Sequence, residues 1–281
     1  MQTFRNEKDK SVVEAVQKWS VFPEIQDVTI IGTGNVAAWL VYALKKAHFH
    51  ISQIYGRNVR KCQNLADVCD AEPIYDLSNL KKNSDLYIFS VKDDCYENVI
   101  SQIPFELPMA VLTAGSVSQN VLALITPQYG TLYPCQSLSR DMDFSQVVVP
   151  LCVEGCDKTV ENQLLQFASR LSERVIPLRE KEREILHLAA VYACNFSNAL
   201  YGIAFEILKN ANIKPEILIP LLKNTLNKLD SMSPAEAQTG PAVRNDKSVI
   251  DKHLSMISNE LHREIYQKMT DEIIIQAVKK S

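Results

Sequence analysis

Hydrophobic residues follow two different patterns along the 281-residue chain, and one gives way to the other near residue 178. Before that point, short apolar runs of strand length alternate with segments of helical spacing. This alternation is typical of α/β proteins, so residues 27–178 are predicted to form a doubly wound, mostly parallel Rossmann sheet. Strands are predicted at residues 28–31, 51–55, 73–75, 86–91, 109–113, 130–133 and 147–153, and helices after the first strand, at 60–69, from about 118, and at 158–174.

After residue 179 the strand signals disappear, and the pattern predicts an all-α domain over residues 179–281. Its first helix covers residues 180–210 and is apolar on nearly every face. Such a helix has to be buried, either at the centre of a helical domain or in a subunit interface. Residues 1–26 form an N-terminal extension, either an added amphipathic helix or a poorly ordered leader. Further helices are predicted to begin at Pro215 and Pro234 and to cover residues 249–257 and 261–278.

A glycine turn stands between the first predicted strand and the helix after it. It reads GTGNVA, the G-x-G-x-x-A fingerprint of dinucleotide-binding domains. Gly32 allows the tight turn, Gly34 lets the backbone approach a pyrophosphate, and Ala37 lets the helix pack close to the strand. Amides at the helix N-terminus would then point at the anion. A tight turn that holds no phosphate is the alternative. The residues predicted to bind a cofactor here are Gly32, Thr33, Gly34, Asn35, Val36 and Ala37.

The residues after the second predicted strand distinguish NAD from NADP. An NAD-specific fingerprint usually has an acidic side chain here, which accepts hydrogen bonds from the ribose 2′-hydroxyl. This chain has Arg57, with Arg60 and Lys61 just beyond, and a guanidinium can bind a 2′-phosphate through two hydrogen bonds. We therefore predict that the cofactor is NADP. The alternative is that Arg57 is an ordinary solvated arginine with no role in binding. Ligands of parallel sheets lie beyond the carboxyl ends of the strands, so we predict further cofactor contacts. They are Asn58, Ser90, Val91 and Lys92.

A polar loop, residues 134–139, follows the sixth predicted strand. Loops at the carboxyl ends of strands often carry binding residues. Gln136 and Ser137 are therefore predicted to contact the substrate or the nicotinamide, and the alternative is a plain surface loop.

Three polar residues interrupt the long apolar helix: His187, Asn195 and Asn198. At about 100° per residue they share one stripe of an ideal α-helix. Buried polar groups cost free energy unless they are paired. They form either a structural network or the wall of a wet cleft between the domains, and in the second case Asn198 would contact the substrate.

Residues 238–246, QTGPAVRND, form a polar insertion within the helical half. Gly240 and Pro241 predict a turn. The segment is either a structural turn that caps the next helix or a site where Arg244 reaches the cleft and binds an anionic substrate group.

Composition narrows the class of protein further. The chain is 46% hydrophobic and 22% charged, with a net charge of −3, which gives no electrostatic reason to expect nucleic acid or an anionic membrane as partner. Its seven cysteines contain no C-x-x-C and are interpreted as free thiols of a reducing cytoplasm, without a metal site. No uninterrupted apolar run has the length of a membrane helix, and the N-terminus lacks a signal peptide, so we expect a cytoplasmic location.

Four motifs together resemble one known family: GTGNVA, YPCQSLS, HLAAVYACNFSNAL and QTGPAVRND. Over residues 27–278 the chain is similar to Rossmann-like proteins labelled NADP oxidoreductases, whose C-terminal domain is of unknown function. These are relatives of pyrroline-5-carboxylate reductase and of deazaflavin-dependent NADP oxidoreductases. The resemblance implies an NADP domain, a helical domain similar to that of 6-phosphogluconate dehydrogenase, and a homodimer through the long helices. Related hydroxyacid dehydrogenases carry a lysine where this chain has Val191, which argues against 3-hydroxyacid chemistry.

Together these features predict an NADP-dependent oxidoreductase that acts on a small carbonyl or imine held between the domains. His187 would be the general acid, because imidazole ordinarily titrates near neutrality, and Asn195 would orient the substrate. Gln136 and Ser137 would line the opposite wall. The alternatives are a non-catalytic NADP-binding module that recruits a protein partner and a scaffold dimer that binds no nucleotide.

Overall fold

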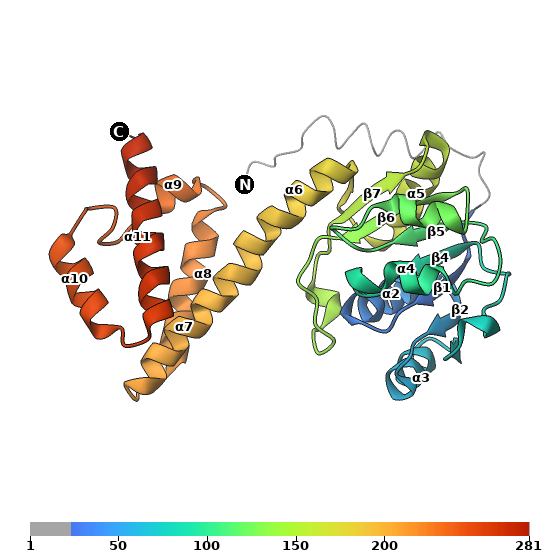
Figure 1. The fold of residues 1–281 in the computed structure, drawn as a ribbon, viewed down its shortest axis with the longest axis horizontal. Helices are drawn as coiled ribbons and strands as arrows, with labels where there is room; N and C mark the ends of the chain where they lie inside the picture. Colours follow the sequence, from blue (N-terminus) through green and yellow to red (C-terminus); the bar gives the residue numbers. More distant parts are fainter. Residues whose placement is uncertain (1–23, 281) are drawn as a thin grey trace. The chain divides into compact units, whose positions relative to one another are not determined.

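The computed structural model describes residues 24–280, so residues 1–23 of the predicted N-terminal extension lie outside that range. A single eight-stranded sheet forms the first half (Figure 1), with strand order β3-β2-β1-β4-β5-β6-β7-β8. Only the β6–β7 pair is antiparallel within this sheet. The strands are β1 Asp27–Ile31, β2 His50–Tyr55, β3 Glu72–Ile74, β4 Leu86–Phe89, β5 Ala110–Leu112, β6 Tyr129–Pro134, β7 Leu151–Gly155 and β8 Val175–Pro177. The predicted Rossmann fold is therefore confirmed.

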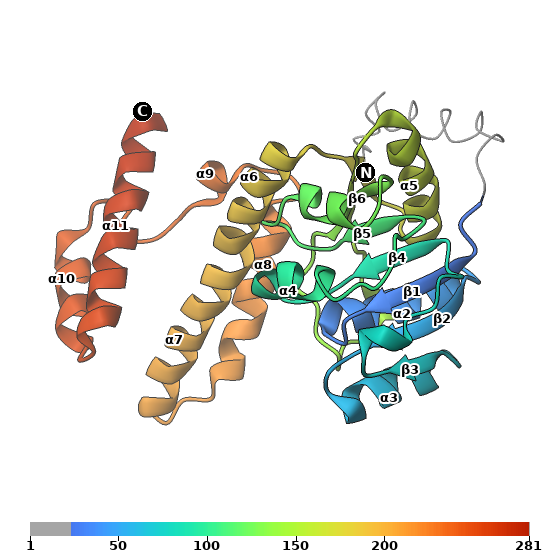
Figure 2. The same ribbon diagram turned by 45° about the vertical axis from the view of Figure 1, so that its right-hand side comes forward.

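Helices cover both faces of this sheet. Successive side chains of a strand point to opposite faces, and here the apolar side chains on both faces are buried. Ile30 and Ile88 pack with Leu40 in one buried cluster, whereas their neighbours Ile31 and Phe89 belong to a second cluster on the other face. Figure 2 shows strands β6, β5, β4, β1, β2 and β3 side by side in that order. The helices are α2 Asn35–Lys46, α3 Val59–Asp67, α4 Tyr96–Ile100 and α5 Lys158–Leu171, with short 3₁₀ turns at 77–79, 93–95, 119–124 and 144–146.

Three local predictions differ from the structure. The helix expected from about 118 is a 3₁₀ turn, Gln119–Leu124, and α4 was not predicted. The seventh strand begins at Leu151 rather than at Val147. Pro150 has no N–H to give to a strand ladder, so regular pairing starts directly after it.

The second half is all-α, as predicted. Its long helix consists of α6 Glu180–Ala190, a π-helical segment Val191–Phe196 and α7 Ser197–Asn210. By contacts the chain divides into two compact units, 1–194 and 195–281, so the division falls inside this helix and later than the predicted boundary at 178. The remaining helices are a 3₁₀ turn Pro215–Leu218, α8 Ile219–Lys228, α9 Pro234–Ala237, α10 Lys247–Met256 and α11 Glu260–Lys280.

The long helix is not buried within a single chain, although its apolar pattern predicted burial. Ile185 is 69% exposed, Leu188 is 59% exposed and Ile207 is 51% exposed. Of the described helices, this is the one that is long and apolar enough to cross a membrane, with a mean hydropathy of 1.3 over a window of which 0% is buried. The search of the sequence for uninterrupted apolar runs does not find this helix, because polar residues interrupt its apolar surface. A helix with this many exposed apolar side chains is expected to pack against another surface.

Candidate cofactor and active site

A pocket of about 610 Å³ lies at the carboxyl ends of the strands in the first unit. Four backbone segments line it, residues 32–36, 55–58, 90–93 and 113–115, together with side chains from Lys61, Tyr133 and His187. These segments directly follow β1, β2, β4 and β5. The pocket therefore lies where ligands of open parallel sheets bind.

The two glycines of the fingerprint have different surroundings. At Gly32 the backbone φ is 133°, and an added Cβ would lie 2.0 Å from the carbonyl oxygen of Ser90, so only glycine fits. At Gly34 no described atom lies within 4 Å of an added Cβ, so the backbone there borders open space. Ala37 is fully buried, in agreement with its predicted packing role.

The start of α2 suits an anion. Gly34 is its N-cap, no side chain caps it, and its first turn holds no acidic residue. The N–H groups and the positive end of the helix dipole therefore meet the pocket without a competing carboxylate. Asn35 is held in place by a 2.9 Å hydrogen bond from its Nδ2 to the carbonyl oxygen of Leu138. A pyrophosphate fits the open N-terminus of α2, where the helix dipole is positive.

Two cationic side chains line the pocket after β2, namely Arg57 and Lys61. An Nη of Arg57 lies 3.9 Å from Cys95 Sγ. Asn58 has a structural role, because its Oδ1 accepts a hydrogen bond of 2.9 Å from the N–H of Lys61 and so caps α3. This end of the pocket can neutralise a phosphate in addition to the pyrophosphate.

Beyond β4, the pocket is lined by Asp93 and by three residues predicted to contact the cofactor, Ser90, Val91 and Lys92. The N–H of Ser90 donates to the carbonyl oxygen of Ile31 over 2.7 Å, which fixes the neighbouring strand ends. The carboxylate of Asp93 accepts a hydrogen bond from the hydroxyl of Ser116. This contact ties the ends of β4 and β5 together.

The opposite end of the pocket holds a pair of ionisable side chains, Tyr133 and His187. Tyr133 Oη and His187 Nδ1 share a hydrogen bond of 3.1 Å, and their rings meet edge to face at 6.0 Å. Gly115 lies against the imidazole, since a Cβ there would be 2.6 Å from Nδ1. Burial raises the pKa of Tyr133 above its ordinary value, with the nearby Cys135 thiol adding to the effect. Tyr133 therefore stays protonated and can act as a hydrogen-bond donor.

Comparison with known proteins agrees with this geometry. The family model described as NADP oxidoreductase coenzyme F420-dependent matches residues 27–113, and the model described as domain of unknown function (DUF2520) matches residues 149–273. A solved "putative NADP oxidoreductase" of Bacteroides fragilis is 34% identical, with 89% of this chain and 98% of that one covered and a TM-score of 0.84. The chain belongs to this family of NADP oxidoreductase domains joined to a DUF2520 domain.

Two other solved structures, with lower identity, share the fold alone. A protein of Thermotoga maritima is 20% identical, covering 90% of this chain and 99% of its own, with a TM-score of 0.67. The 1-pyrroline-5-carboxylate reductase of Streptococcus pyogenes is 16% identical, covering 89% and 97%, with a TM-score of 0.62. No curated protein matches the chain.

In this family member, the loop predicted to hold the substrate makes local bonds instead. Nε2 of Gln136 donates to the carbonyl oxygen of Val148 over 3.1 Å, and its Oε1 accepts from the N–H of Ser137 over 2.9 Å. Both residues are exposed, and neither belongs to the described lining of the pocket. Tyr133, one residue before the carboxyl end of β6, lines the pocket instead. The sequence pattern predicts it only as a strand residue, although a place near a carboxyl strand end is a usable signal of a binding role.

The remaining predicted residues, Asn195, Asn198 and Arg244, belong to the second unit and are exposed. Asn195 lies in the π-helical segment, where the turn per residue differs from that of an α-helix, so the stripe calculated for an ideal helix does not apply. A metal site is not indicated within residues 24–280, where no group of three or more His, Cys, Asp and Glu could hold an ion.

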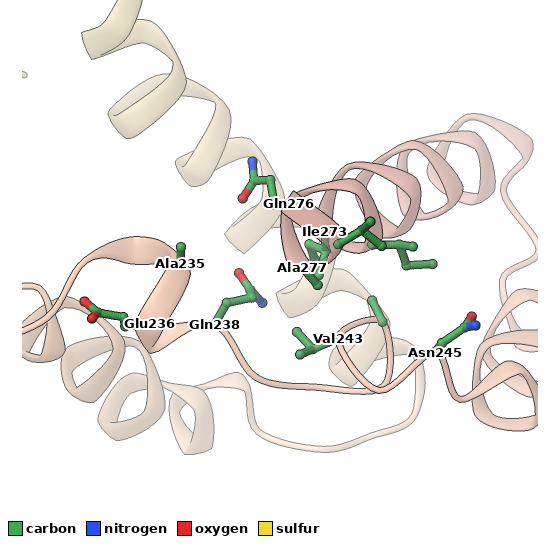
Figure 3. Close-up of a pocket in the computed structure, with 11 residues that line it drawn as sticks. Ala235, Glu236, Gln238, Val243, Asn245, Ile273, Gln276 and Ala277 are labelled. Atoms are coloured by element: carbon green, nitrogen blue, oxygen red, sulfur yellow. The ribbon is translucent and has the colours of Figure 1, made fainter. Parts of the chain in front are cut away.

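The turn that carries Arg244 has a clear structural role. Asp246 accepts a hydrogen bond from the N–H of Val249 and so caps α10. Val243 and Asn245, on either side of Arg244, line a pocket of about 540 Å³ against α11 (Figure 3). Figure 3 also shows Gln238, Val243 and Ala277 around the same pocket. The interpretation as a helix-capping turn therefore accounts for the contacts of this segment.

Proposed function

We propose that this protein is an NADP(H)-dependent oxidoreductase that interconverts a small carbonyl or imine with its reduced form. One observation carries the proposal: a single pocket holds an anion-binding glycine turn, two cations suited to a 2′-phosphate, and a Tyr133–His187 pair able to supply a proton. The fold shared with pyrroline-5-carboxylate reductases supports cyclic imines as the first substrates to test.

The chain's own residues account for selection of the cofactor. In our proposal the amides that begin α2 bind the pyrophosphate across the open space at Gly34. Arg57 and Lys61 then bind the 2′-phosphate, which NAD lacks. When bound, the nicotinamide supplies the hydride.

Proton transfer falls to Tyr133 and His187. Because burial raises the pKa of Tyr133, its hydroxyl keeps its proton. In our proposal it donates that proton in the hydrogen bond that it shares with Nδ1 of His187. A neutral imidazole that accepts at Nδ1 carries its own proton on Nε2. In our proposal that Nε2–H is given to the substrate oxygen or nitrogen while the Tyr133 hydroxyl passes its proton to Nδ1, so the imidazole ends the step neutral, and water then returns a proton to Tyr133. Asn195, Asn198 and Arg244 remain predictions for substrate contact.

Titration of the purified protein with NADPH and NADH, followed by intrinsic fluorescence, tests the cofactor assignment. Arg57→Ala and Lys61→Ala are each expected to weaken NADPH binding by about 10- to 100-fold and to leave NADH binding nearly unchanged, because charge-assisted bonds to the 2′-phosphate are lost. Arg60→Ala is the matched control, because the described lining of the pocket includes its neighbour Lys61 but not Arg60. Failure to bind either nucleotide would overturn the proposal and favour a scaffold role.

A screen of carbonyl and imine substrates with NADPH then tests the reaction itself. Oxidation of NADPH that depends on the added substrate supports the oxidoreductase. Tight NADPH binding without turnover on any substrate, combined with NADPH-dependent capture of a partner protein, would instead support a binding module.

We also propose that a second copy of the chain covers the long helix. Apolar side chains along it, including Ile185, Leu188 and Ile207, are exposed within one chain. In the second unit, an apolar hollow of about 390 Å³ is lined by Leu200 and Ile203 of the same helix together with α11 residues. An apolar surface of this extent is typical of a subunit interface.

A further inference from the structure

Arg183 is the largest fully buried side chain of the described residues, with 1% exposure. Its Nη1 donates to Oε2 of Glu154 over 2.9 Å, and its Nη2 donates to the carbonyl oxygen of Val117 over 3.0 Å. Nε has no hydrogen-bond partner among the described residues. Burying a guanidinium is costly, and an ion pair with Glu154 is often no better than apolar packing. Because burying this side chain costs free energy, we expect Arg183 to have a role other than stability alone.

The two arms of Arg183 join three separate elements. Glu154 belongs to β7, and Val117 follows β5 in the same backbone turn as Gly115. Arg183 itself lies on α6, one helical turn before His187. The same turn after β5 makes a second contact with α6, since Ser118 Oγ donates to Oε2 of Glu180 over 2.7 Å. The segment that lies against the imidazole is thus bonded to the helix that carries it.

The distance between Arg183 and His187 along α6 matches the distance between their partners along the sheet. On the antiparallel β6–β7 pair, Glu154 is opposite Thr131 and Cys152 is opposite Tyr133. Two residues along a strand cover about 6.6 Å, close to the roughly 6 Å between residues four apart on a helix. When Arg183 bonds to Glu154, His187 is therefore brought level with Tyr133. The ion pair sets the register between α6 and the sheet.

We infer that Arg183 is the positioning residue that fixes the His187 ring between Tyr133 and Gly115. Its rigid planar fork reaches Glu154 and Val117 through two separate nitrogens, whereas a lysine has a single nitrogen with rotatable donors and cannot reproduce that fixed geometry. The consequence for turnover rests on the proposed function. The consequence for the imidazole does not, because the contact with Tyr133 exists whatever the reaction is.

Nitrogen NMR of the His187 side chain tests the inference without any substrate. The wild-type imidazole should show one tautomer, with the proton on Nε2, and Arg183→Lys should give a mixture of tautomers. Arg179→Lys is the matched control, because Arg179 also bonds the start of α6 to another element, α5, through a 2.6 Å ion pair with Glu161. It should leave the His187 signals unchanged. An unchanged His187 tautomer in Arg183→Lys would overturn the inference.

A second measurement follows turnover once a substrate is known. Arg183→Lys should lower kcat by about 10- to 100-fold and alter its pH profile, while NADPH affinity stays within about twofold. Where Arg183→Lys does not fold, the double variant Arg183→Gln with Glu154→Gln removes both charges and leaves no unpaired ion. It should show the same mixture of tautomers, and a wild-type tautomer there would overturn the inference. Absence of turnover in the wild type would count against the proposed function alone.

Discussion

Tyr133 and His187 are 54 residues apart in sequence, yet Tyr133 Oη and His187 Nδ1 lie 3.1 Å apart. The tyrosine stands near the carboxyl end of β6, and the histidine stands in the third turn of α6. Both line the pocket that also contains the glycine turn. This contact joins the cofactor-binding sheet to the helix that leads into the second unit.

The pair predicts how two substitutions affect turnover. Tyr133→Phe keeps the ring but removes the donor to Nδ1, so kcat should fall by about 100-fold with little change in NADPH affinity. His187→Gln should abolish measurable turnover and also leave NADPH affinity intact. Tyr129→Phe is the control, because its hydroxyl lies at the other end of β6, bonded to Asn120. Turnover that survives in His187→Gln would remove His187 from the acid role.

The two glycines of the fingerprint should respond differently to alanine. Gly32→Ala meets a φ of 133° and a carbonyl oxygen 2.0 Å from the new Cβ, so unfolding free energy should fall by at least about 2 kcal/mol. Gly34→Ala has open space around the new methyl, so stability should change by less than about 1 kcal/mol. NADPH affinity of Gly34→Ala should nevertheless fall by about tenfold or more, because the methyl fills the approach to the pyrophosphate. Denaturant unfolding and NADPH titration of both variants measure this, and full NADPH affinity in Gly34→Ala would contradict the assignment.

Buried Tyr96 predicts a loss of stability at high pH. Its hydroxyl donates to the carbonyl oxygen of Phe89 over 2.9 Å, and burial raises its pKa from 10.0 to about 12. A folded-state pKa above the unfolded value means that the stabilisation is complete below pH 10 and is lost as the pH rises toward 12. The difference in unfolding free energy between wild type and Tyr96→Phe should shrink over that interval by about 3 kcal/mol. A difference that stays constant across this pH range would show that the Tyr96 hydroxyl ionises normally.

The exposed long helix predicts the oligomeric state. Sedimentation should give twice the 31.7 kDa chain mass for the wild type and the single mass for Leu188→Asp, since a charge there would be buried against the second copy. Leu124→Asp is the control, because Leu124 is 83% exposed but belongs to the 3₁₀ turn Gln119–Leu124 and not to the long helix. A monomeric wild type would refute the dimer, and binding to lipid vesicles would identify a membrane as the cover of the helix.

The sequence by itself determined the elements whose signals are local. The run from Val28 to Ile31, followed by Gly32, identified β1 and the glycine turn. The change of apolar periodicity after residue 178 marked the beginning of the all-α half. Strand length, glycine turns and apolar spacing depend on neighbours along the chain, so they can be read without tertiary structure. The Rossmann sheet, the basic residue at Arg57 and the all-α half all follow from such signals.

Only the tertiary structure decided which side chains meet. Gln136 was predicted for the site, and its amide bonds to Ser137 and Val148 in the β6–β7 connection, whereas Tyr133 reaches His187 because β6 pairs antiparallel with β7 and α6 lies against them. Arg183 and Glu154 gave no signal at all, since each is an ordinary charged residue until the fold buries them together. Contacts between distant residues depend on strand pairing and helix packing, which the whole chain determines and which no local pattern encodes.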